Sequence, residues 1–302
     1  VKLDASGNLT WQKCLGSNDD DEAHVIKQTT DGGYIVGGYV SAGDGDVSAN
    51  NGQEDGWLVK LDTSGTIEWE TNLGGSHNER INDLFELDNG NFLFCALTES
   101  VDGDVSGNHG AAGWSDFWIG EVTSAGALQW QKCLGGAGDD MLYNAASLAD
   151  GGYLLVGSTD SSDGDVSGGH GSKDIWVVKV DSSGALLWQV CLGGSLDDEG
   201  WQVQPTADSG CLVSGYSASD NGNVSGSHGC GDYWVVKLQS DTSMEWQRCY
   251  GGTLGDSGRS IILTSDGGYA VLGESNSHDG DVSGSHGLEE FWAIKRPAVT
   301  AP

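Results

Sequence analysis

Two series of tryptophans recur along the chain at a nearly constant interval. The first series is Trp11, Trp69, Trp130, Trp188 and Trp246, and the second is Trp57, Trp118, Trp176, Trp234 and Trp292. The interval is 58 residues, except for one step of 61 in each series. A repeat of this length indicates one supersecondary unit that stacks on its neighbours. The chain is therefore expected to contain five copies of one such unit.

Each copy contains four strand-like runs. In the third copy they cover residues 141–147, 153–157, 175–180 and 186–192, and each run is bounded by a turn or loop that contains glycine. Valine, leucine, isoleucine and aromatic residues dominate these runs, as in strands that are at least half buried. No segment shows sustained helical periodicity. Each copy is thus predicted to form four antiparallel strands.

Four antiparallel strands repeated in tandem describe the blade of a β-propeller. The chain starts with a fourth-strand sequence at residues 9–14 and ends on a third-strand sequence at residues 291–295. Pairing of these two segments would complete the last blade and cover an exposed edge. We predict an all-β, five-bladed β-propeller over residues 1–296, with 297–302 as a linker or tail. An open slice of a longer array is the alternative.

The charge balance excludes several partners. Acidic residues number 45 against 13 basic ones, a net charge of −32. Nucleic acid needs clustered Lys and Arg for phosphate contacts, and no apolar run approaches the ~20 residues of a membrane span. We expect a monomer whose natural small partners are cations. The seven cysteines are expected to be mostly buried hydrophobic residues without disulfides.

The repeat resembles a known bacterial family. Leu-Gly-Gly followed by an acid, Asp-Gly-Gly-Tyr, Asp-x-Trp-Val-Val-Lys-Leu-Asp and Gly-x-Leu-x-Trp are similar to β-propeller repeats of the SBBP type. The resemblance covers nearly all of the chain. It implies a module of a large secreted or cell-surface protein, many of which come from Bacteroidetes-like bacteria, and hence an extracellular location. The long Asp-Gly-Asp-Val-Ser-Gly loop departs from the shorter connection of that repeat.

That loop has the spacing of an EF-hand-like calcium site. Asp163, Asp165, Ser167 and Asp174 occupy loop positions 1, 3, 5 and 12, and Gly168 occupies position 6. Alternate residues in such a loop can point oxygens at one centre, and glycine at position 6 allows the sharp bend. The spacing predicts a Ca²⁺ site. A metal-free Asx-turn is the alternative, and another cation is a third possibility.

The other four copies keep the pattern with variations, so up to five calcium sites are expected. Their predicted ligands are Asp44, Asp46, Ser48 and Asp55; Asp102, Asp104, Ser106 and Asp116; Asn221, Asn223, Ser225 and Asp232; and Asp279, Asp281, Ser283 and Glu290. The copy with two asparagines should bind most weakly. A histidine follows the serine by three residues in four copies, at His109, His170, His228 and His286, and local hydrogen bonding is its expected role.

The loops between the fourth and first strands carry Asp21, Asp140, Asp198 and Asp256, with Asn78 in the remaining copy. These residues are expected to cap or stabilise turns. Three positions further on stand His24, Ile81, Tyr143, Trp201 and Arg259, which differ between copies. We predict that His24, Tyr143, Trp201 and Arg259, together with Trp114 of the three-residue insertion, meet a protein or glycan ligand on the loop face. Packing between blades is the alternative role for Tyr143 and Trp201.

Three functions are consistent with the sequence. The preferred one is a calcium-stabilised, non-catalytic propeller module of a larger secreted or surface protein, used for adhesion or rigid display. The second is a carbohydrate-binding lectin. The third is a polysaccharide-acting hydrolase whose acid would be Asp83, which is expected to stand where other copies have Ile26, Ala145, Val203 and Ile261. Catalysis needs dissimilar groups at one place, and most polar residues here recur five times.

Overall fold

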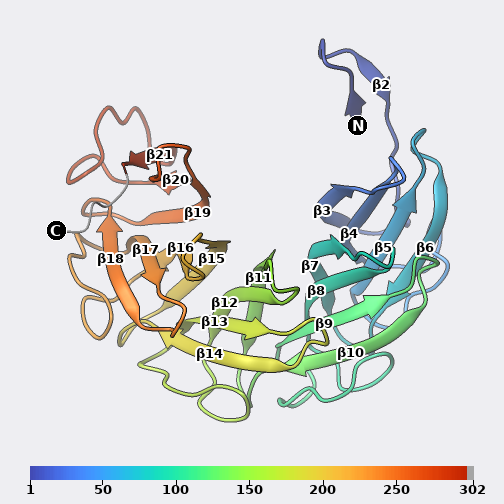
Figure 1. The fold of residues 1–302 in the computed structure, drawn as a ribbon, viewed down its shortest axis with the longest axis horizontal. Helices are drawn as coiled ribbons and strands as arrows, with labels where there is room; N and C mark the ends of the chain where they lie inside the picture. The colour runs from blue at the N-terminus through green and yellow to red at the C-terminus, as the bar shows by residue number, and fades with distance from the viewer. Residues whose placement is uncertain (298–302) are drawn as a thin grey trace. The chain divides into compact units, whose positions relative to one another are not determined.

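The computed structural model describes residues 1–297, and every regular element in that range is a β-strand (Figure 1). The described residues contain no helix that could cross a membrane. The chain divides into two compact units, unit 1 (residues 1–137) and unit 2 (residue 138 onward). Residues 298–302, most of the predicted tail, lie outside the described residues.

Unit 1 contains a short hairpin and two four-stranded antiparallel sheets. The hairpin pairs β1 (Lys2–Leu3) with β2 (Leu9–Trp11). Sheet 1 consists of β3 (Asp21–Gln28), β4 (Tyr34–Val40), β5 (Asp55–Leu61) and β6 (Ile67–Leu73). Sheet 2 consists of β7 (Glu79–Glu86), β8 (Phe92–Thr98), β9 (Asp116–Val122) and β10 (Leu128–Leu134).

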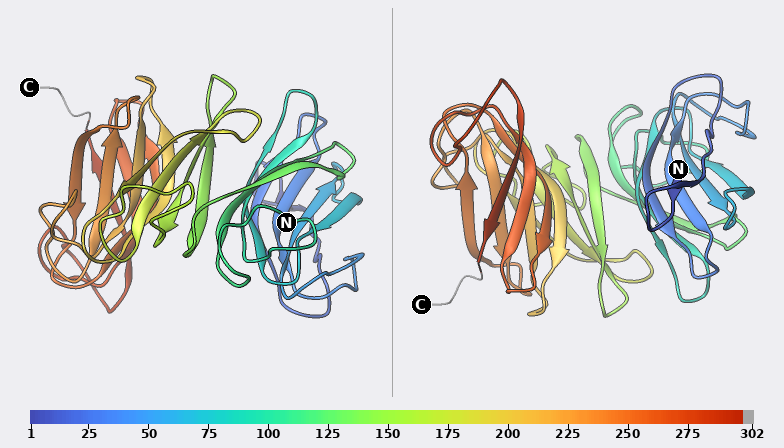
Figure 2. Two further views of the ribbon diagram at one scale, coloured as in Figure 1. Left: turned by 90° about the horizontal axis from the view of Figure 1, so that it is seen from below. Right: turned by 90° about the horizontal axis from the view of Figure 1, so that it is seen from above.

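Unit 2 contains two four-stranded sheets and a three-stranded one, all antiparallel (Figure 2). Sheet 3 consists of β11 (Asp140–Ser147), β12 (Tyr153–Thr159), β13 (Asp174–Val180) and β14 (Leu186–Leu192). Sheet 4 consists of β15 (Asp198–Pro205), β16 (Cys211–Ser217), β17 (Asp232–Leu238) and β18 (Met244–Tyr250). Sheet 5 consists of β19 (Asp256–Leu263), β20 (Tyr269–Ser275) and β21 (Glu290–Arg296). The predicted all-β, propeller-like repetition of antiparallel four-stranded sheets is thus confirmed.

The pairing predicted to complete the fifth blade is not formed among the described residues. β21 pairs with β20, whereas β2 pairs with β1 across a short turn. A hairpin closes a much shorter loop than a pairing between the two chain ends and therefore costs less chain entropy. Sheet 5 accordingly has three strands in this structure.

Consecutive sheets within a unit pack face to face. In unit 2, Ile175 and Val177 of sheet 3 pack with Val203, Val213 and Trp234 of sheet 4 in one buried cluster. Trp118, Trp176 and Trp234, which share one position on the third strand, are fully buried. These third-strand tryptophans therefore anchor the core of each sheet.

Tryptophans of the fourth strands fix neighbouring copies of the repeat to one another. Trp69 of β6 donates its indole Nε1–H to the carbonyl of Ser124, in the turn between the third and fourth strands of the next sheet, at 2.8 Å. Trp11 makes the same bond to Thr63 of sheet 1 at 3.2 Å. The N-terminal segment therefore lies on sheet 1 as a fourth strand lies on the sheet that follows it.

The first strand of every sheet carries a β-bulge, and this bulge corrects two sequence assignments. The register shifts between Ile81 and Asp83 in β7, so Asn82, and not Ile81, stands where His24 stands in β3. β7 begins at Glu79, so the capping position belongs to Glu79 and not to Asn78. The prediction for Asp83 was also wrong by one residue, because Leu84, and not Asp83, aligns with Ile26, Ala145, Val203 and Ile261.

All seven cysteines are free, and most are buried, as expected. Five are buried, and Cys14 and Cys230 are exposed. Burial raises the pKa of Cys191 to about 12, with a further contribution from the nearby Asp174 carboxylate. The buried thiols therefore behave as small hydrophobic groups and not as nucleophiles.

Ile175→Ala tests the packing between sheets. Ile175 is fully buried, so its truncation should lower the free energy of unfolding by about 2–5 kcal/mol. Leu187→Ala is the matched control, because Leu187 is 55% exposed and its truncation should change stability by less than about 0.5 kcal/mol. Urea unfolding followed by tryptophan fluorescence measures both, and equal effects of the two variants would contradict the packing described.

Candidate functional site

A row of acids marks the loop end of every sheet. The first residues of the first and third strands are acidic, and the last residue of the second strand lies between them. These carboxylate rows are Asp21–Val40–Asp55, Glu79–Thr98–Asp116, Asp140–Thr159–Asp174, Asp198–Ser217–Asp232 and Asp256–Ser275–Glu290. Eight of these ten acids are buried, which is rare for carboxylates unless they are paired or hydrogen-bonded.

The acids of the first strands are well supplied with donors. Glu79 accepts the amide of Gly75 and the hydroxyl of Thr98, at 2.8 and 2.7 Å. Asp256 accepts the amide of Gly252 at 2.9 Å and the hydroxyl of Ser277 at 2.8 Å. The predicted role in stabilising turns is confirmed for Asp21, Asp198 and Asp256, each of which accepts the amide four residues earlier.

The acids of the third strands, predicted as position 12 of the calcium loops, close the preceding loop onto the sheet. Asp232 accepts the amide of His228 at 2.8 Å, and the Nδ1 atom of that ring lies 3.1 Å from the same oxygen. Asp116 is held in the same way by His109, with the ring at 2.8 Å. The local hydrogen bonding expected of the loop histidines is confirmed in these two sheets.

Positions 1 and 3 of the predicted calcium loops bind the neighbouring loop between fourth and first strands. Asp102 accepts the amide of Ser76 at 2.8 Å, and Asp104 accepts that of Gly74 at 3.3 Å. The equivalent acceptors elsewhere are Asp44, Asp46, Asn221, Asn223 and Asp279. The two kinds of loop therefore share one end of each sheet.

The serine at position 5 of the predicted calcium loops belongs, in three sheets, to a chain of hydrogen bonds that we call the relay. Ser167 accepts Nε2 of Gln189 at 2.6 Å, and Oε1 of Gln189 accepts the indole N–H of buried Trp176 at 2.9 Å. The same relay joins Ser106, Gln131 and Trp118, and also Ser225, Gln247 and Trp234. Ser48 and Ser283 are exposed. The glutamine two residues before Cys133, Cys191 and Cys249 is the sequence signal for this relay.

The predicted calcium ligands of one loop therefore have different partners in this structure. Within residues 1–297, no three His, Cys, Asp or Glu side chains form a group that could hold a metal ion. Burial raises the pKa of Asp55 to about 6, and repulsion from Glu79 and Asp104 adds to that shift. The carboxylates that raise the pKa of Asp55 thus belong to the neighbouring sheet and its loop, and not to the loop of Asp55 itself.

Three of the predicted ligand-binding residues form a stacked ladder in unit 2. The rings of Tyr143 and Trp201 lie 4.3 Å apart with an interplanar angle of 29°. The guanidinium of Arg259 lies 3.9 Å from the centre of the Trp201 ring and bonds Glu274 at 2.7 Å. All three side chains come from the bulge of a first strand.

The other two predicted ligand residues lie in unit 1. Nδ1 of His24 is 2.8 Å from the amide oxygen of Asn82. Trp114 stands in the loop between β8 and β9 and is 44% exposed. Within unit 2 the structure therefore brings Tyr143, Trp201 and Arg259 together.

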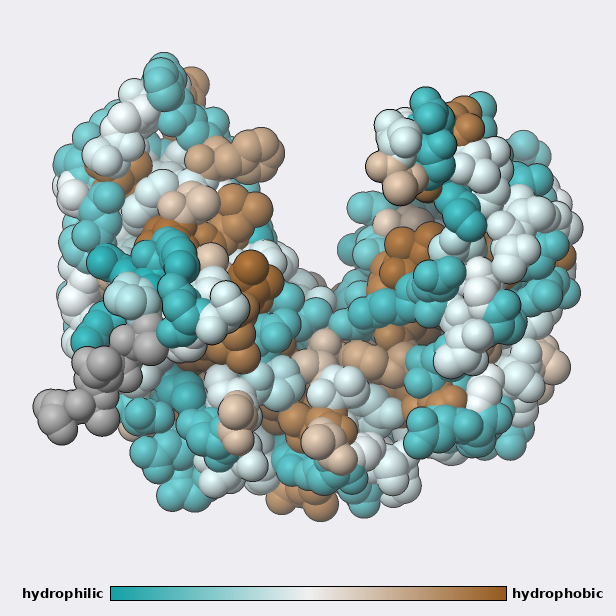
Figure 3. All heavy atoms as spheres, turned by 45° about the horizontal axis from the view of Figure 1, so that its top comes forward, coloured by the Kyte–Doolittle hydropathy of each residue, from teal (hydrophilic) through white to brown (hydrophobic). Residues whose placement is uncertain are grey.

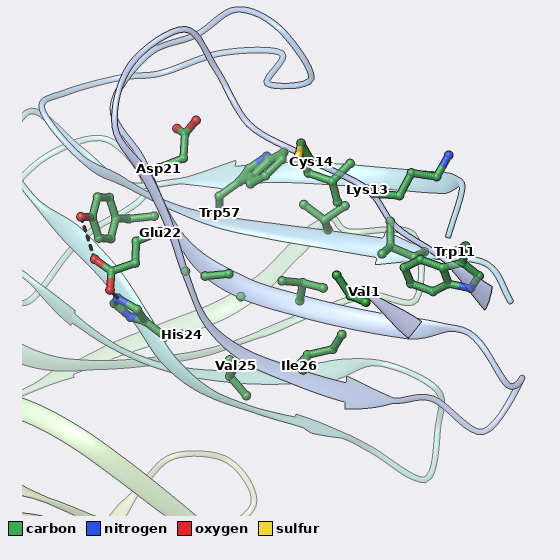
Figure 4. Close-up of a pocket in the computed structure, with 18 residues that line it drawn as sticks. Val1, Trp11, Lys13, Cys14, Asp21, Glu22, His24, Val25, Ile26 and Trp57 are labelled. Atoms are coloured by element: carbon green, nitrogen blue, oxygen red, sulfur yellow. Dashed lines mark hydrogen bonds and ion pairs between the residues drawn. The ribbon is translucent and has the colours of Figure 1, made fainter. Parts of the chain in front are cut away.

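A hollow of about 510 Å³, which the sequence pattern does not reveal, lies on one face of sheet 1. Its lining includes Ile26, Val36, Trp57 and Val59, and His24 lies at one end (Figure 4). The equivalents of Ile26 in sheets 2, 4 and 5 are fully buried, whereas Ile26 is 58% exposed. The hollow is thus an exposed apolar face of sheet 1, and the equivalent face is covered in sheets 2, 4 and 5.

Asp83, the acid of the hydrolase hypothesis, is 5% exposed. Its carboxylate lies 3.1 Å from Nζ of Lys27 and accepts the amide of Leu84 at 2.8 Å. Arg80, which stands three residues earlier in the sequence, pairs instead with Glu54. A buried carboxylate already engaged with a lysine and an amide forms a structural ion pair.

Gln189→Ala tests the relay. The substitution leaves the buried indole N–H of Trp176 without its acceptor and should cost about 1–3 kcal/mol. It should also speed amide hydrogen exchange in the loop of residues 163–171, because Ser167 loses its tie to the sheet. Gln129→Ala, at an exposed position of β10, is the control and should change neither quantity. Equal exchange in wild type and Gln189→Ala would contradict the relay.

Comparison with known proteins supports the fold alone. No family model and no curated protein matches the chain. A solved structure of a protein of unknown function from Bacteroides caccae is similar over 96% of this chain and 87% of that one, with a TM-score of 0.51 and 14% identity. A mannose phosphorylase from Leishmania mexicana, solved with a phosphate ion, covers 88% of this chain and 85% of its own at a TM-score of 0.40 and 11% identity. The second likeness is too weak to inform function.

Proposed function

We propose that the chain is a non-catalytic β-propeller module of a secreted or cell-surface protein, which presents a rigid face for adhesion to a protein or glycan. The observation that carries this proposal is the contrast at the loop end of the sheets. Residues that recur in every copy make internal hydrogen bonds, whereas the bulge positions differ from copy to copy. A surface that varies on a constant scaffold is suited to binding.

The ladder of Tyr143, Trp201 and Arg259 is the proposed centre of that face. Trp201 has Tyr143 on one side and Arg259 on the other, so its conformation is fixed before a ligand arrives. Preorganised aromatic and arginine side chains lose little entropy on binding. Arg259 is exposed and can offer its remaining guanidinium donors to a ligand carboxylate, hydroxyl or carbonyl.

We further propose that the module closes as a five-bladed ring through residues 9–14, as the sequence suggests. Trp11 already bonds sheet 1 as Trp69 bonds sheet 2. β21 has one neighbour, β20, and thus offers a free edge. By analogy with β13 and β14, in which Val177 pairs with Val190, Ala293 should pair with Lys13.

Exposed apolar side chains on two sheets support closure. In sheet 5, Phe291 is 94% exposed and Leu272 49% exposed, although Ile175 and Tyr233, the equivalents of Phe291 in sheets 3 and 4, are fully buried. Sheet 1 has the hollow described above. Figure 3 shows hydrophobic side chains at the surface of both units. Large exposed apolar faces are unusual in a soluble domain unless something covers them.

Calcium remains part of the proposal. The chain carries 32 more acidic than basic charges, and the buried carboxylate rows lie at the end where the calcium loops were predicted. A cation that binds only the folded state would stabilise the module. Its site is considered separately below.

Lectin activity is the second candidate, favoured by the exposure of Trp114 (44%). An exposed indole can stack on a sugar ring without displacing another side chain. In this case Trp114, and not the ladder, would carry the binding.

Engineered cysteines test ring closure. In a Cys14→Ala, Cys230→Ala background, which removes the exposed thiols, Lys13→Cys and Ala293→Cys should form an intramolecular disulfide on mild oxidation. Directly paired residues on antiparallel strands have Cα atoms about 4.5–5.5 Å apart, within the range that a disulfide spans. Lys13→Cys with Leu263→Cys, on a different strand of sheet 5, is the control. Absence of the first disulfide, or its formation only between molecules, would contradict closure.

A glycan and extracellular-protein array tests the binding proposal. A reducing-sugar assay run in parallel detects any hydrolysis. Wild type should bind a ligand without releasing sugar, and Arg259→Ala should weaken binding about tenfold, the effect of losing roughly 1.4 kcal/mol at a contact residue. Trp114→Ala should leave binding unchanged. Loss of binding in Trp114→Ala alone would favour the lectin. Sugar release abolished by Asp83→Asn would overturn the non-catalytic proposal.

A further inference from the structure

Buried carboxylates face one another where one sheet meets the next within a unit. Asp174 Oδ1 of sheet 3 and Asp198 Oδ2 of sheet 4 lie 2.1 and 2.6 Å from the point where a Cβ on Gly193 would stand. Asp232 Oδ1 and Asp256 Oδ2 lie 2.4 and 2.6 Å from the same point on Gly251. The two oxygens of each pair are therefore close neighbours.

The junction between sheets 1 and 2 has the same arrangement. Asp55 Oδ1 and Glu79 Oε2 lie 2.9 and 2.3 Å from the Cβ point of Gly74. Three junctions, one in unit 1 and two in unit 2, thus repeat a pattern of third-strand acid, glycine and first-strand acid. A larger side chain at any of these glycines would collide with both carboxylates.

One oxygen in each pair has no hydrogen-bond partner. Oδ1 of Asp55, of Asp174 and of Asp232 is buried and accepts no hydrogen bond, and these residues are 0%, 2% and 0% exposed. Oδ1 of Asp174 alone has the Nδ1 atom of His170 nearby, at 3.5 Å. Within a sheet the hydroxyl of Ser217 or Ser275 donates to a carboxylate of the row. Across the junction the intervening residue is glycine, which has no side-chain donor.

Two carboxylates in a medium of low dielectric constant repel each other and lose hydration. Burial of such a pair is stable only if positive charge or a proton is supplied between them. The unpartnered oxygens therefore point to a ligand at the junction. Oxygen-only donor sets of this kind suit calcium, which takes carboxylate, carbonyl and water oxygens in flexible geometry.

A third acid distinguishes two of the junctions. Asp281 donates its amide to Gly251 O at 2.8 Å, and Asp104 donates its amide to Gly74 O at 2.9 Å. The corresponding residue at Gly193 is Asn223. The Gly251 and Gly74 junctions thus have an acid anchored through its backbone next to the carboxylate pair, whereas the Gly193 junction has an asparagine there.

We propose that calcium binds at the sheet junctions, between the paired carboxylates of Asp232 and Asp256 and between those of Asp55 and Glu79, with backbone and water oxygens completing its shell. The nearby Asp281 and Asp104 add negative charge. The Asp174–Asp198 junction should bind more weakly. This inference rests on the calcium dependence proposed for the module, but it assigns the ion to acids of two sheets. It does not depend on ring closure or on the binding ladder.

The proposal accounts for the EF-hand-like spacing in a different way. Position 12 of one calcium loop and position 3 of the next calcium loop lie at the same junction. Both positions can therefore be acidic in successive copies although they do not bind an ion within a single loop. Asp256 and Glu79, which belong to no calcium loop, become ligands. Ser225, at position 5 of the fourth loop, does not.

Asp232→Asn tests the junction site. Asparagine can still accept the amide of His228, while its NH₂ group can donate to Asp256 and replace the ion. We expect this variant to lose one calcium per chain in elemental analysis after gel filtration. Its melting midpoint should rise less with calcium than that of wild type, and its midpoint in EDTA should be no lower.

Ser225→Ala is the control, because it removes a ligand of the fourth loop and leaves the junction intact. It should keep the wild-type calcium content. Loss of one calcium in Ser225→Ala would overturn the junction and favour the loop site, as would unchanged calcium content in Asp232→Asn. Wild-type protein without bound calcium, and with the same midpoint in calcium and EDTA, would refute both calcium sites. The binding and closure proposals would not be affected.

Discussion

The carboxylate rows at the loop ends of the sheets organise most of what surrounds them. Each acid stands at the first residue of a strand, and acids such as Asp55, Asp174 and Asp232 accept the amide of a residue in the preceding loop, so the strand start and the loop are fixed together. Asp198, for example, binds Gly194, Ser217 and Ser219. Loops without such acceptors would leave buried amides unsatisfied.

The relay from serine through glutamine to tryptophan joins these loops to the core. Trp176 packs in the centre of its sheet while its indole N–H reaches, through Gln189, to the loop at Ser167. Loop conformation is therefore coupled to packing inside the sheet. Because these ties recur, differences between copies are concentrated at the bulges, where Tyr143, Trp201 and Arg259 stack. This division between a constant scaffold and a varied face is the basis of the proposed binding function.

Much of the fold could be predicted from sequence, because the tryptophan spacing and the glycine-bounded apolar runs are strong local signals. The alignment of Asp83 was wrong by one residue, because the second copy places Glu79 at the start of its first strand. The spacing of acids within one loop could not reveal which carboxylates face each other across Gly193 or Gly251, since those contacts join separate sheets. Closure through residues 9–14 remains a prediction, because chain-end pairing has no local signal.

The most direct test of this account is a crystal structure grown with calcium, with anomalous diffraction recorded to locate the ions. The account predicts anomalous peaks bounded by Asp232 and Asp256 and by Asp55 and Glu79, with a weaker peak or none between Asp174 and Asp198. Peaks confined to the loops, beside Ser167 or Ser225, would contradict the junction assignment. Absence of a peak at every junction would mean that protons, and not cations, balance the buried carboxylates.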